Sequence, residues 1–375
     1  MFNKINRQPA YAFAVGLKRL RANISYLRSD GLGADPEAIT LFLTHRCNLR
    51  CKMCGQWGES GVTKELGSEQ IKEELGFEVY QGMLDEVSGY KPNITLFGGE
   101  PLLYSRCLDL IRYIKTKKMH CLMISNGALL KKFSEQLVSA GLDEFNLSLD
   151  GGKELHDEIR GMPGLFDLIF EGLKMLQDIK RKKGVKKPLI NLQCTVTKYN
   201  YQRLEELIDV ADEIGVDSLT YHNLIFLDKD LLKKQDKFDQ ELAASSKAWE
   251  GFVFSPEIDV EKLYGKIHSI LSSNHSFGVD FYPNLSKKGL REYYNNPSYL
   301  PQEYKARCLS PWIVAYVFPD GEVRPCLNST YSFGNIKDKP FNKVWNSSQA
   351  LKFRKTLKSN QMFPVCARCT ELYRY

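Results

Sequence analysis

Short apolar segments alternate with helical stretches through the first 225 residues, and this alternation limits the fold more than any other feature. About six strand-and-helix units can be counted between residues 38 and 225. The helical stretches, such as residues 129–140 and 166–181, carry apolar residues at spacings of three and four. Such alternation gives parallel strands with crossover helices, whose ligands bind at the carboxyl ends of the strands. The sequence therefore predicts an α/β fold with a site at that edge.

Glycine-rich or polar turns follow several of the expected strands. The apolar segment 93–97 leads into Gly98 and Gly99, where the missing side chains let the backbone approach a neighbouring group. Taken alone, this Gly-Gly-Glu-Pro sequence is compatible with any turn. Further polar turns follow the apolar segments 121–124 and 146–149. These turns lie where a shared site would form.

Three cysteines, Cys47, Cys51 and Cys54, occur in one ten-residue run with the spacing C-x3-C-x2-C. Three thiolates this close can hold three irons of a cubane iron–sulfur cluster and leave the fourth iron without a protein ligand. A zinc site is one alternative, although structural zinc prefers four ligands in C-x2-C pairs, and His45 lies awkwardly near Cys47 for tetrahedral closure. Three unrelated buried cysteines are the other alternative.

The cysteine run resembles the signature of the radical S-adenosylmethionine (radical SAM) superfamily. In that family the three cysteines hold a 4Fe–4S cluster, and SAM chelates the open iron. The reduced cluster then splits SAM into methionine and a 5′-deoxyadenosyl radical. The residue before the third cysteine usually packs near the adenine, which implies that role for Met53. The resemblance also implies a partial (β/α)6 TIM-like barrel.

The same resemblance assigns further SAM contacts to the turns after the strands. Residues 98–101 match the family's GGEP element, which contacts the SAM amino group. The cofactor-binding candidates from these turns are Gly98, Gly99, Glu100, Pro101, Ser125, Asn126, Ser148, Asp150 and Arg160. Ser148 and Asp150 could equally cap the ends of strands instead of contacting SAM. Arg160 could equally form a surface ion pair.

A second cysteine set, Cys308, Cys326, Cys366 and Cys369, resembles the auxiliary-cluster module of the SPASM and twitch radical SAM enzymes. A hairpin turn at Asp320-Gly321 would bring the first two of these cysteines together. The resemblance implies a closed auxiliary 4Fe–4S site with four protein ligands. Because the chain ends soon after Cys369, we expect one auxiliary cluster. A four-cysteine zinc ribbon is the alternative.

These motifs divide the chain into four expected parts. Residues 1–36 form an amphipathic helical segment, 37–227 the radical SAM core, 228–306 a helical bridge that covers the substrate end, and 307–375 the auxiliary module. Ten cysteines without a signal peptide indicate a reducing compartment, so we expect a cytoplasmic protein.

The N-terminal segment carries an apolar helical stripe. Its members are Phe13, Leu17, Leu20, Ile24 and Leu27, and the basic residues Lys18, Arg19, Arg21 and Arg28 lie off it. Such a helix packs against the barrel or makes peripheral membrane contact through residues 10–28. The net charge of +7 is modest and no aromatic-basic recognition motif occurs, so no DNA partner is expected.

The resemblance implies an enzyme that abstracts a hydrogen atom from a peptide or small-molecule substrate and oxidises or otherwise modifies it. An external one-electron reductant of the flavodoxin or ferredoxin type would supply the electron. The alternative is a non-catalytic iron–sulfur scaffold or electron-transfer protein. The intact GGEP element and cysteine spacing favour the enzyme. No residue stands out as a catalytic acid, base or radical relay.

Overall fold

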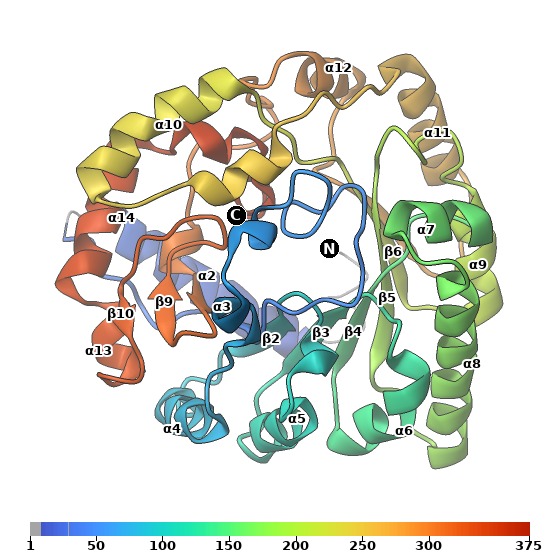
Figure 1. The fold of residues 1–375 in the computed structure, drawn as a ribbon, viewed down its shortest axis with the longest axis horizontal. Helices are drawn as coiled ribbons and strands as arrows, with labels where there is room; N and C mark the ends of the chain where they lie inside the picture. The colour runs from blue at the N-terminus through green and yellow to red at the C-terminus, as the bar shows by residue number, and fades with distance from the viewer. Residues whose placement is uncertain (1–8, 29) are drawn as a thin grey trace.

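A computed structural model describes residues 9–28 and 30–375 of the chain, so the part of the predicted segment 1–36 that falls on residues 1–8 and 29 lies outside the described residues. Its centre is one ten-stranded sheet with the order β10-β9-β8-β1-β2-β3-β4-β5-β6-β7 (Figure 1). The strands are β1 Ala38–Phe42, β2 Asn93–Phe97, β3 Cys121–Ser125, β4 Glu144–Ser148, β5 Leu189–Thr195, β6 Ser218–His222, β7 Gly278–Tyr282, β8 Val314–Val317, β9 Glu322–Arg324 and β10 Gly334–Asn335.

Strands β1 to β7 run parallel, each paired with the next. All five residues of β1 are buried, as expected for a strand covered on both faces. Helices surround the sheet (Figure 1): α4 Phe77–Val87, α5 Cys107–Thr116, α6 Leu130–Ala140, α7 Lys153–Arg160, α8 Leu165–Lys183 and α9 Glu206–Ile214. Four of them end at a left-handed glycine, Gly141, Gly161, Gly184 or Gly215, which only glycine adopts without strain. The predicted α/β partial barrel is confirmed.

The sheet continues beyond the six strands that the sequence indicates. β7 lies within the expected helical bridge, where no strand was predicted. Only Phe281 of its five residues is buried, so the segment lacks the alternation that marks a strand. At the other edge β8 pairs parallel with β1, and β8 and β9 form the hairpin expected around Gly321. The auxiliary module is therefore joined to the barrel through one continuous sheet.

Short helices complete the bridge and the auxiliary module. The bridge contains α10 Lys229–Leu242, α11 Val260–Ser272 and α12 Lys287–Asn295, and the module contains α13 Phe341–Trp345 and α14 Ser348–Asn360. A small helix, α3 Ser68–Lys72, follows the long loop after β1. The bridge contacts this loop where the Phe252 ring lies against Gly55, whereas α11 and α12 lie at the side of the barrel (Figure 1).

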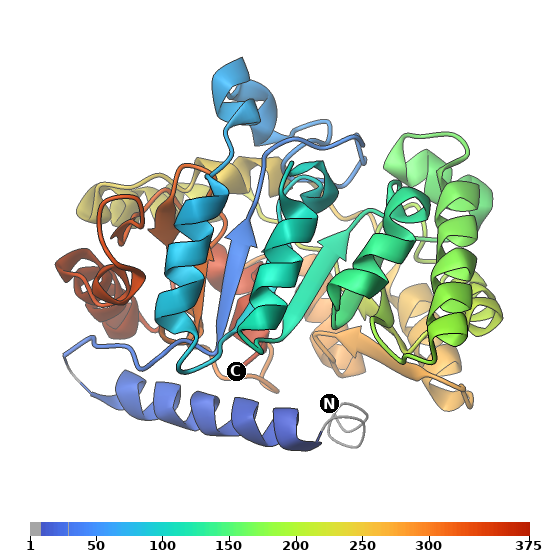
Figure 2. The same cartoon turned by 90° about the horizontal axis from the view of Figure 1, so that it is seen from below.

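The N-terminal helix, α2 Pro9–Leu27, lies beneath the barrel (Figure 2). Arg19 pairs with Glu37, directly before β1, at 2.9 Å, and Lys18 Nζ donates to the Lys91 carbonyl, just before β2, at 2.6 Å. These contacts hold α2 at the amino ends of the strands. Within the described residues no helix is long and apolar enough to cross a membrane.

Candidate SAM and iron–sulfur sites

A cavity of about 350 Å³ opens at the carboxyl ends of the strands. Its wall combines the loop after β1 (residues 43–61, here the cluster loop), the ends of β2 to β6, the bridge and the auxiliary module. Ten of the predicted site residues line it: Cys47, Cys51, Met53, Cys54, Gly98, Gly99, Ser125, Asn126, Ser148 and Arg160. Folding thus brings together side chains that lie more than a hundred residues apart.

Each cysteine of the first set receives an N–H group. Asn126 Nδ2 lies 3.8 Å from the Cys47 sulfur, and Arg160 Nη1 lies 3.7 Å from the Cys51 sulfur. The backbone N–H of Trp57 donates to the Cys54 sulfur at 3.4 Å. Hydrogen bonds to sulfur stabilise thiolates and tune the reduction potential of an iron–sulfur cluster. This donor set fits a 4Fe–4S cluster that is held by three cysteines.

The free thiols of this set resist ionisation. Burial raises the pKa of Cys47 to about 11 and also raises that of Cys51, and the neighbouring cysteines add to the effect. An iron that binds them must displace their protons. Among residues 9–28 and 30–375, no three His, Cys, Asp or Glu side chains meet closely enough for a single metal ion.

The two glycines of the GGEP turn pack against the cluster loop. A Cβ on Gly99 would lie 2.2 Å from the Arg46 carbonyl oxygen, and one on Gly98, whose φ is +148°, would lie 2.7 Å from that of Thr44. The backbone N–H of Gly99 also donates to the Thr44 carbonyl at 2.8 Å. The glycines therefore allow the turn to approach the cysteine-bearing loop as well as the cavity.

Glu100 does not line the cavity. Its carboxylate is fully buried and accepts from Ser125 Oγ at 2.9 Å, from the Asn126 N–H at 2.9 Å and from the Leu102 N–H at 3.2 Å. Burial raises the pKa of Glu100 to about 7, although the three hydrogen bonds oppose that rise. Glu100 therefore links the turn after β2 to the turn after β3. Its predicted contact with the SAM amino group stays a prediction.

Asp150 and Arg160 form a buried ion pair at 2.6 Å, with side chains 0% and 12% exposed. Asp150 also accepts from the Thr195 N–H at 2.9 Å, so it caps the end of the neighbouring strand. The surface ion pair considered for Arg160 is wrong, because the pair is enclosed between α7 and the strand ends. Asp150 and the buried Pro101 do not line the cavity, whereas Arg160 reaches it beside Cys51.

Several cavity residues were not among the predicted site residues. His222, at the carboxyl end of β6, lies 2.6 Å from Gln193 Oε1, and burial lowers its pKa to about 4, so its ring is neutral. Its position at a strand end is a signal that the sequence did offer. Phe252 from the bridge and Thr370 from the auxiliary module also line the cavity, and no motif marks either of them.

The four cysteines of the second set surround a separate enclosed space. Three of these cysteines accept a hydrogen bond from the backbone N–H two residues further along the chain, and this bond lowers the pKa of the thiol. The pairs are Cys308 with Ser310, Cys326 with Asn328 and Cys369 with Glu371. Burial opposes ionisation and raises the pKa of Cys326 to about 12 and that of Cys366 to about 11. Four thiolates with backbone donors fit a closed 4Fe–4S site.

The two sites share a wall. Cys369 belongs to the second cysteine set, and the next residue, Thr370, lines the first cavity. Ile225 and Phe252 also line that cavity and pack against the same small apolar cluster as Cys369. A substrate in the first cavity would therefore lie close to the auxiliary site.

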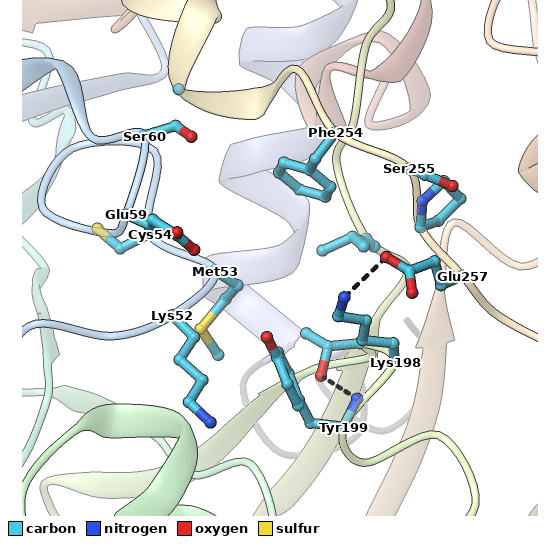
Figure 3. A pocket seen from close by; sticks show the side chains of 14 residues that line it. Lys52, Met53, Cys54, Glu59, Ser60, Lys198, Tyr199, Phe254, Ser255 and Glu257 are labelled. Atoms are coloured by element: carbon cyan, nitrogen blue, oxygen red, sulfur yellow. Dashed lines mark hydrogen bonds and ion pairs between the residues drawn. The ribbon is translucent and has the colours of Figure 1, made fainter.

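A smaller space of about 160 Å³ adjoins the main cavity through Met53, Cys54 and Leu224; we call it the outer compartment. Tyr199 and Phe254 point into it from the turn after β5 and from the bridge (Figure 3).

Charged side chains surround the Tyr199 ring of the outer compartment. Lys198 Nζ pairs with Glu257 at 2.7 Å, and Lys52 Nζ lies 4.6 Å from the centroid of the Tyr199 ring. A Cβ on Gly55 would lie 2.4 Å from the Phe252 ring, so the bridge packs tightly on the cluster loop beside this space.

Comparisons with known proteins agree with this architecture. The Radical SAM superfamily model matches residues 41–211, and the SPASM iron–sulfur cluster-binding domain model matches residues 308–370. The chain is 26% identical over 343 residues to Fe-coproporphyrin III synthase of Methanosarcina barkeri, covering 87% of this chain and 79% of that protein. It is 24% identical over 353 residues to the tungsten-containing aldehyde ferredoxin oxidoreductase cofactor-modifying protein of Pyrococcus furiosus. That match covers 88% of this chain and 86% of that protein.

Solved structures share the fold. Streptococcus suis SuiB bound to S-adenosylmethionine superposes with a TM-score of 0.61 at 15% identity, over 91% of this chain and 72% of that one. The protein anSMEcpe with bound AdoMet superposes with a TM-score of 0.54 at 20% identity, over 86% of this chain and 81% of that one.

The radical SAM model covers residues 41–211 and the SPASM model residues 308–370, so the chain contains a radical SAM domain followed by a SPASM-type auxiliary domain. Its cofactors are therefore SAM, a SAM-binding 4Fe–4S cluster and an auxiliary iron–sulfur cluster.

Proposed function

We propose that this radical SAM enzyme abstracts a hydrogen atom from a substrate that enters through the outer compartment. Bound together, SAM and the reduced 4Fe–4S cluster supply a 5′-deoxyadenosyl radical. We assign the cluster to Cys47, Cys51 and Cys54, which lie in the cavity wall beside the GGEP turn. The observation that supports this proposal best is the shared cavity that joins these thiols, Met53 and the strand-end polar groups.

The chain's own residues position the reactants and exclude water. Arg160 and Asn126 donate to the cysteine sulfurs, and Asp150 fixes Arg160 in place. Glu100 ties the two turns that form the floor of the cavity. Phe252 packs on Gly55 and forms part of the cavity wall, where its ring excludes water.

We propose that the substrate is a small molecule, or a peptide side chain, that carries a carboxylate near an apolar or aromatic part. Two lysines, Lys52 and Lys198, lie around the exposed ring of Tyr199 in the outer compartment. Lys52 pairs with Glu158 at 2.6 Å, and Lys198 pairs with Glu257 at 2.7 Å. These glutamates are 59% and 58% exposed, so a substrate carboxylate can replace either of them at little cost. The apolar part would lie against Tyr199 and Phe254.

The auxiliary cluster is assigned to Cys308, Cys326, Cys366 and Cys369, and four protein ligands leave no iron open to substrate. Its place against the cavity wall suits electron transfer. The first cluster needs an external one-electron donor, which we propose to be a flavodoxin or ferredoxin. None of the ten cysteines, all of which the structure describes, forms a disulfide, which suits the reducing, cytoplasmic location that we propose.

The decisive experiment measures 5′-deoxyadenosine after anaerobic reconstitution with iron and sulfide, reduction, and addition of SAM. We expect the nucleoside to form. Intact protein with both clusters that forms none would instead favour the iron–sulfur scaffold.

The substrate proposal has its own matched test. Once a carboxylate-bearing substrate is identified, Lys198→Gln should raise its KM about tenfold, as loss of one ion pair in a semi-enclosed site predicts. Lys174→Gln is the control, because Lys174 also pairs with an exposed glutamate, Glu213, and lies over the ring of Phe170, but far from the cavity. Equal KM values in both variants would contradict the assignment.

A further inference from the structure

We propose that α2 docks the protein on an anionic lipid surface through an outward-facing row of apolar side chains. This row, the α2 ridge, consists of Phe13, Leu17, Leu20, Ile24 and Leu27, which are 70%, 44%, 57%, 53% and 71% exposed. Spacings of four and three residues align them along one side of the helix over roughly 21 Å, at 1.5 Å per residue. The sequence predicted the stripe but left open which way it faces.

The opposite face of α2 is the one that packs on the barrel. Ala22 and Tyr26 are buried there, and the Tyr26 ring packs edge-on against Trp312 at 5.0 Å. The Arg19–Glu37 ion pair reinforces this contact, and Lys358 Nζ donates to the Leu27 carbonyl at 3.0 Å at the end of the helix. A surface helix ordinarily turns its apolar stripe inward. Here polar contacts fix the helix in the reverse orientation, so the exposure of the ridge is built into the fold.

The charge around the ridge identifies the occupant. Residues 9–28 contain four Lys and Arg and no Asp or Glu. Arg21 and Arg28 are exposed and flank the ridge, and Arg28 shares its charge with Asp30. A basic helix with a row of large apolar residues suits the interface of an anionic membrane, where the apolar side chains insert and the cations meet lipid phosphates.

Two other occupants fit less well. A second copy docked symmetrically on the same surface would bring two sets of like charges together, which is unfavourable. A nucleic acid would neutralise the cations but would leave the aliphatic ridge in water. An acidic protein groove is the remaining alternative, and the test below separates it from lipid.

The position of α2 determines whether the cavity of the docked enzyme faces the membrane or the water. Figure 2 shows α2 along the end of the barrel from which the strands start, whereas the cavity opens at their carboxyl ends. A membrane under α2 therefore leaves the cavity mouth turned toward water. Substrate and electron donor would reach the site from the aqueous phase, and the membrane would serve as a place of attachment.

The test is flotation of the full chain with phosphatidylserine-containing vesicles and with pure phosphatidylcholine vesicles. The wild type should float with the anionic vesicles, and the bound fraction should fall as salt is added. Leu20→Glu combined with Ile24→Glu should reduce binding at least about tenfold, since two charges would enter the apolar layer. Arg21→Gln combined with Arg28→Gln should reduce it about fivefold or more.

A matched control and two contrary results complete the experiment. Leu168→Glu combined with Met175→Glu makes the same change at exposed apolar positions of α8, 37% and 44% exposed, and should leave vesicle binding unchanged. All variants should keep the thermal unfolding midpoint and iron content of the wild type, because the changed side chains are exposed. A wild type that stays off anionic vesicles, or a ridge variant that floats as well as the control, would overturn the proposal.

Discussion

The two cysteine sites differ in where their hydrogen-bond donors come from. At the barrel site, Asn126 and Arg160 donate from separate strand-end segments, and a large cavity adjoins the thiols. At the auxiliary site, backbone N–H groups two residues along the chain favour the thiolates, and four cysteines enclose the space. A site with three thiols and a cavity keeps room for SAM, whereas a site closed by four thiols and local backbone holds a cluster away from ligands.

The largest expected effect tests whether the sites are independent. Replacing Cys47, Cys51 and Cys54 together with alanine should lower the iron content from about eight to about four per chain and abolish 5′-deoxyadenosine formation. Iron analysis and chromatography measure the two quantities. Cys194→Ala, which removes a buried thiol outside both cysteine sets, should keep all of the iron. Loss of all iron from the triple variant would show that the sites assemble together.

Gly99→Val should damage the barrel site alone. Its new side chain would collide with the backbone of Arg46, so we expect loss of SAM binding together with partial loss of the adjacent cluster. The absorbance of the cluster measures how much of it remains, and equilibrium binding measures the affinity for SAM. Gly89→Val is a suitable control, because a Cβ at Gly89 meets no atom within 4 Å. Unchanged SAM affinity in Gly99→Val would remove the GGEP turn from the site.

Cys369→Ala should damage the auxiliary site and leave the barrel site intact. SAM cleavage without substrate should persist, because the barrel cysteines are untouched, while oxidation of substrate should fall at least tenfold if the auxiliary cluster carries an electron. Product analysis beside 5′-deoxyadenosine analysis separates the two activities. Unchanged substrate oxidation would exclude an electron-transfer role, and an unfolded variant would indicate a structural one, since cluster binding can contribute folding free energy.

The smallest expected effect concerns Glu100 and pH. Its folded pKa of about 7 exceeds its ordinary value of 4.5, so folding favours the protonated form. As pH rises from 4.5 to 7, the unfolded chain loses this proton first, and the unfolding free energy should fall by about 1.4 kcal/mol per pH unit from this group. Above pH 7 the fall should stop.

Denaturant titrations of wild type and Glu100→Gln measure that contribution. The difference in unfolding free energy between the two proteins should change with pH across this window. The exposed Glu171→Gln serves as the control. A pH-independent difference for Glu100→Gln would show that the carboxyl titrates as it does in water.

The sequence predicted those site residues whose partners are near in the chain or belong to a motif. The three cysteines of the cluster loop lie within ten residues of sequence, and the GGEP turn follows one strand. The burial of Glu100 depends on the contact between two turns, and the buried pairing of Asp150 with Arg160 depends on the packing of α7. No local sequence pattern indicates either of these contacts.

The parts that the sequence missed have a common physical cause. Thr370 lines the cavity from the auxiliary module, which is joined to the barrel where β8 pairs with β1, and Phe252 lines it from the bridge, where its ring lies against Gly55. β7 lacks alternation because one of its residues alone is buried. The α2 stripe was visible, but its outward direction depends on ion pairs and ring contacts with distant segments.

The most direct test of the contrast between the sites is electron paramagnetic resonance of the reduced protein during addition of SAM. Variants that lack either cysteine set identify the two signals. We predict that SAM alters the signal of the Cys47–Cys51–Cys54 cluster and leaves that of the auxiliary cluster unchanged. A change in the auxiliary signal, or no change in either signal, would contradict the assignment of an open barrel site and a closed auxiliary site.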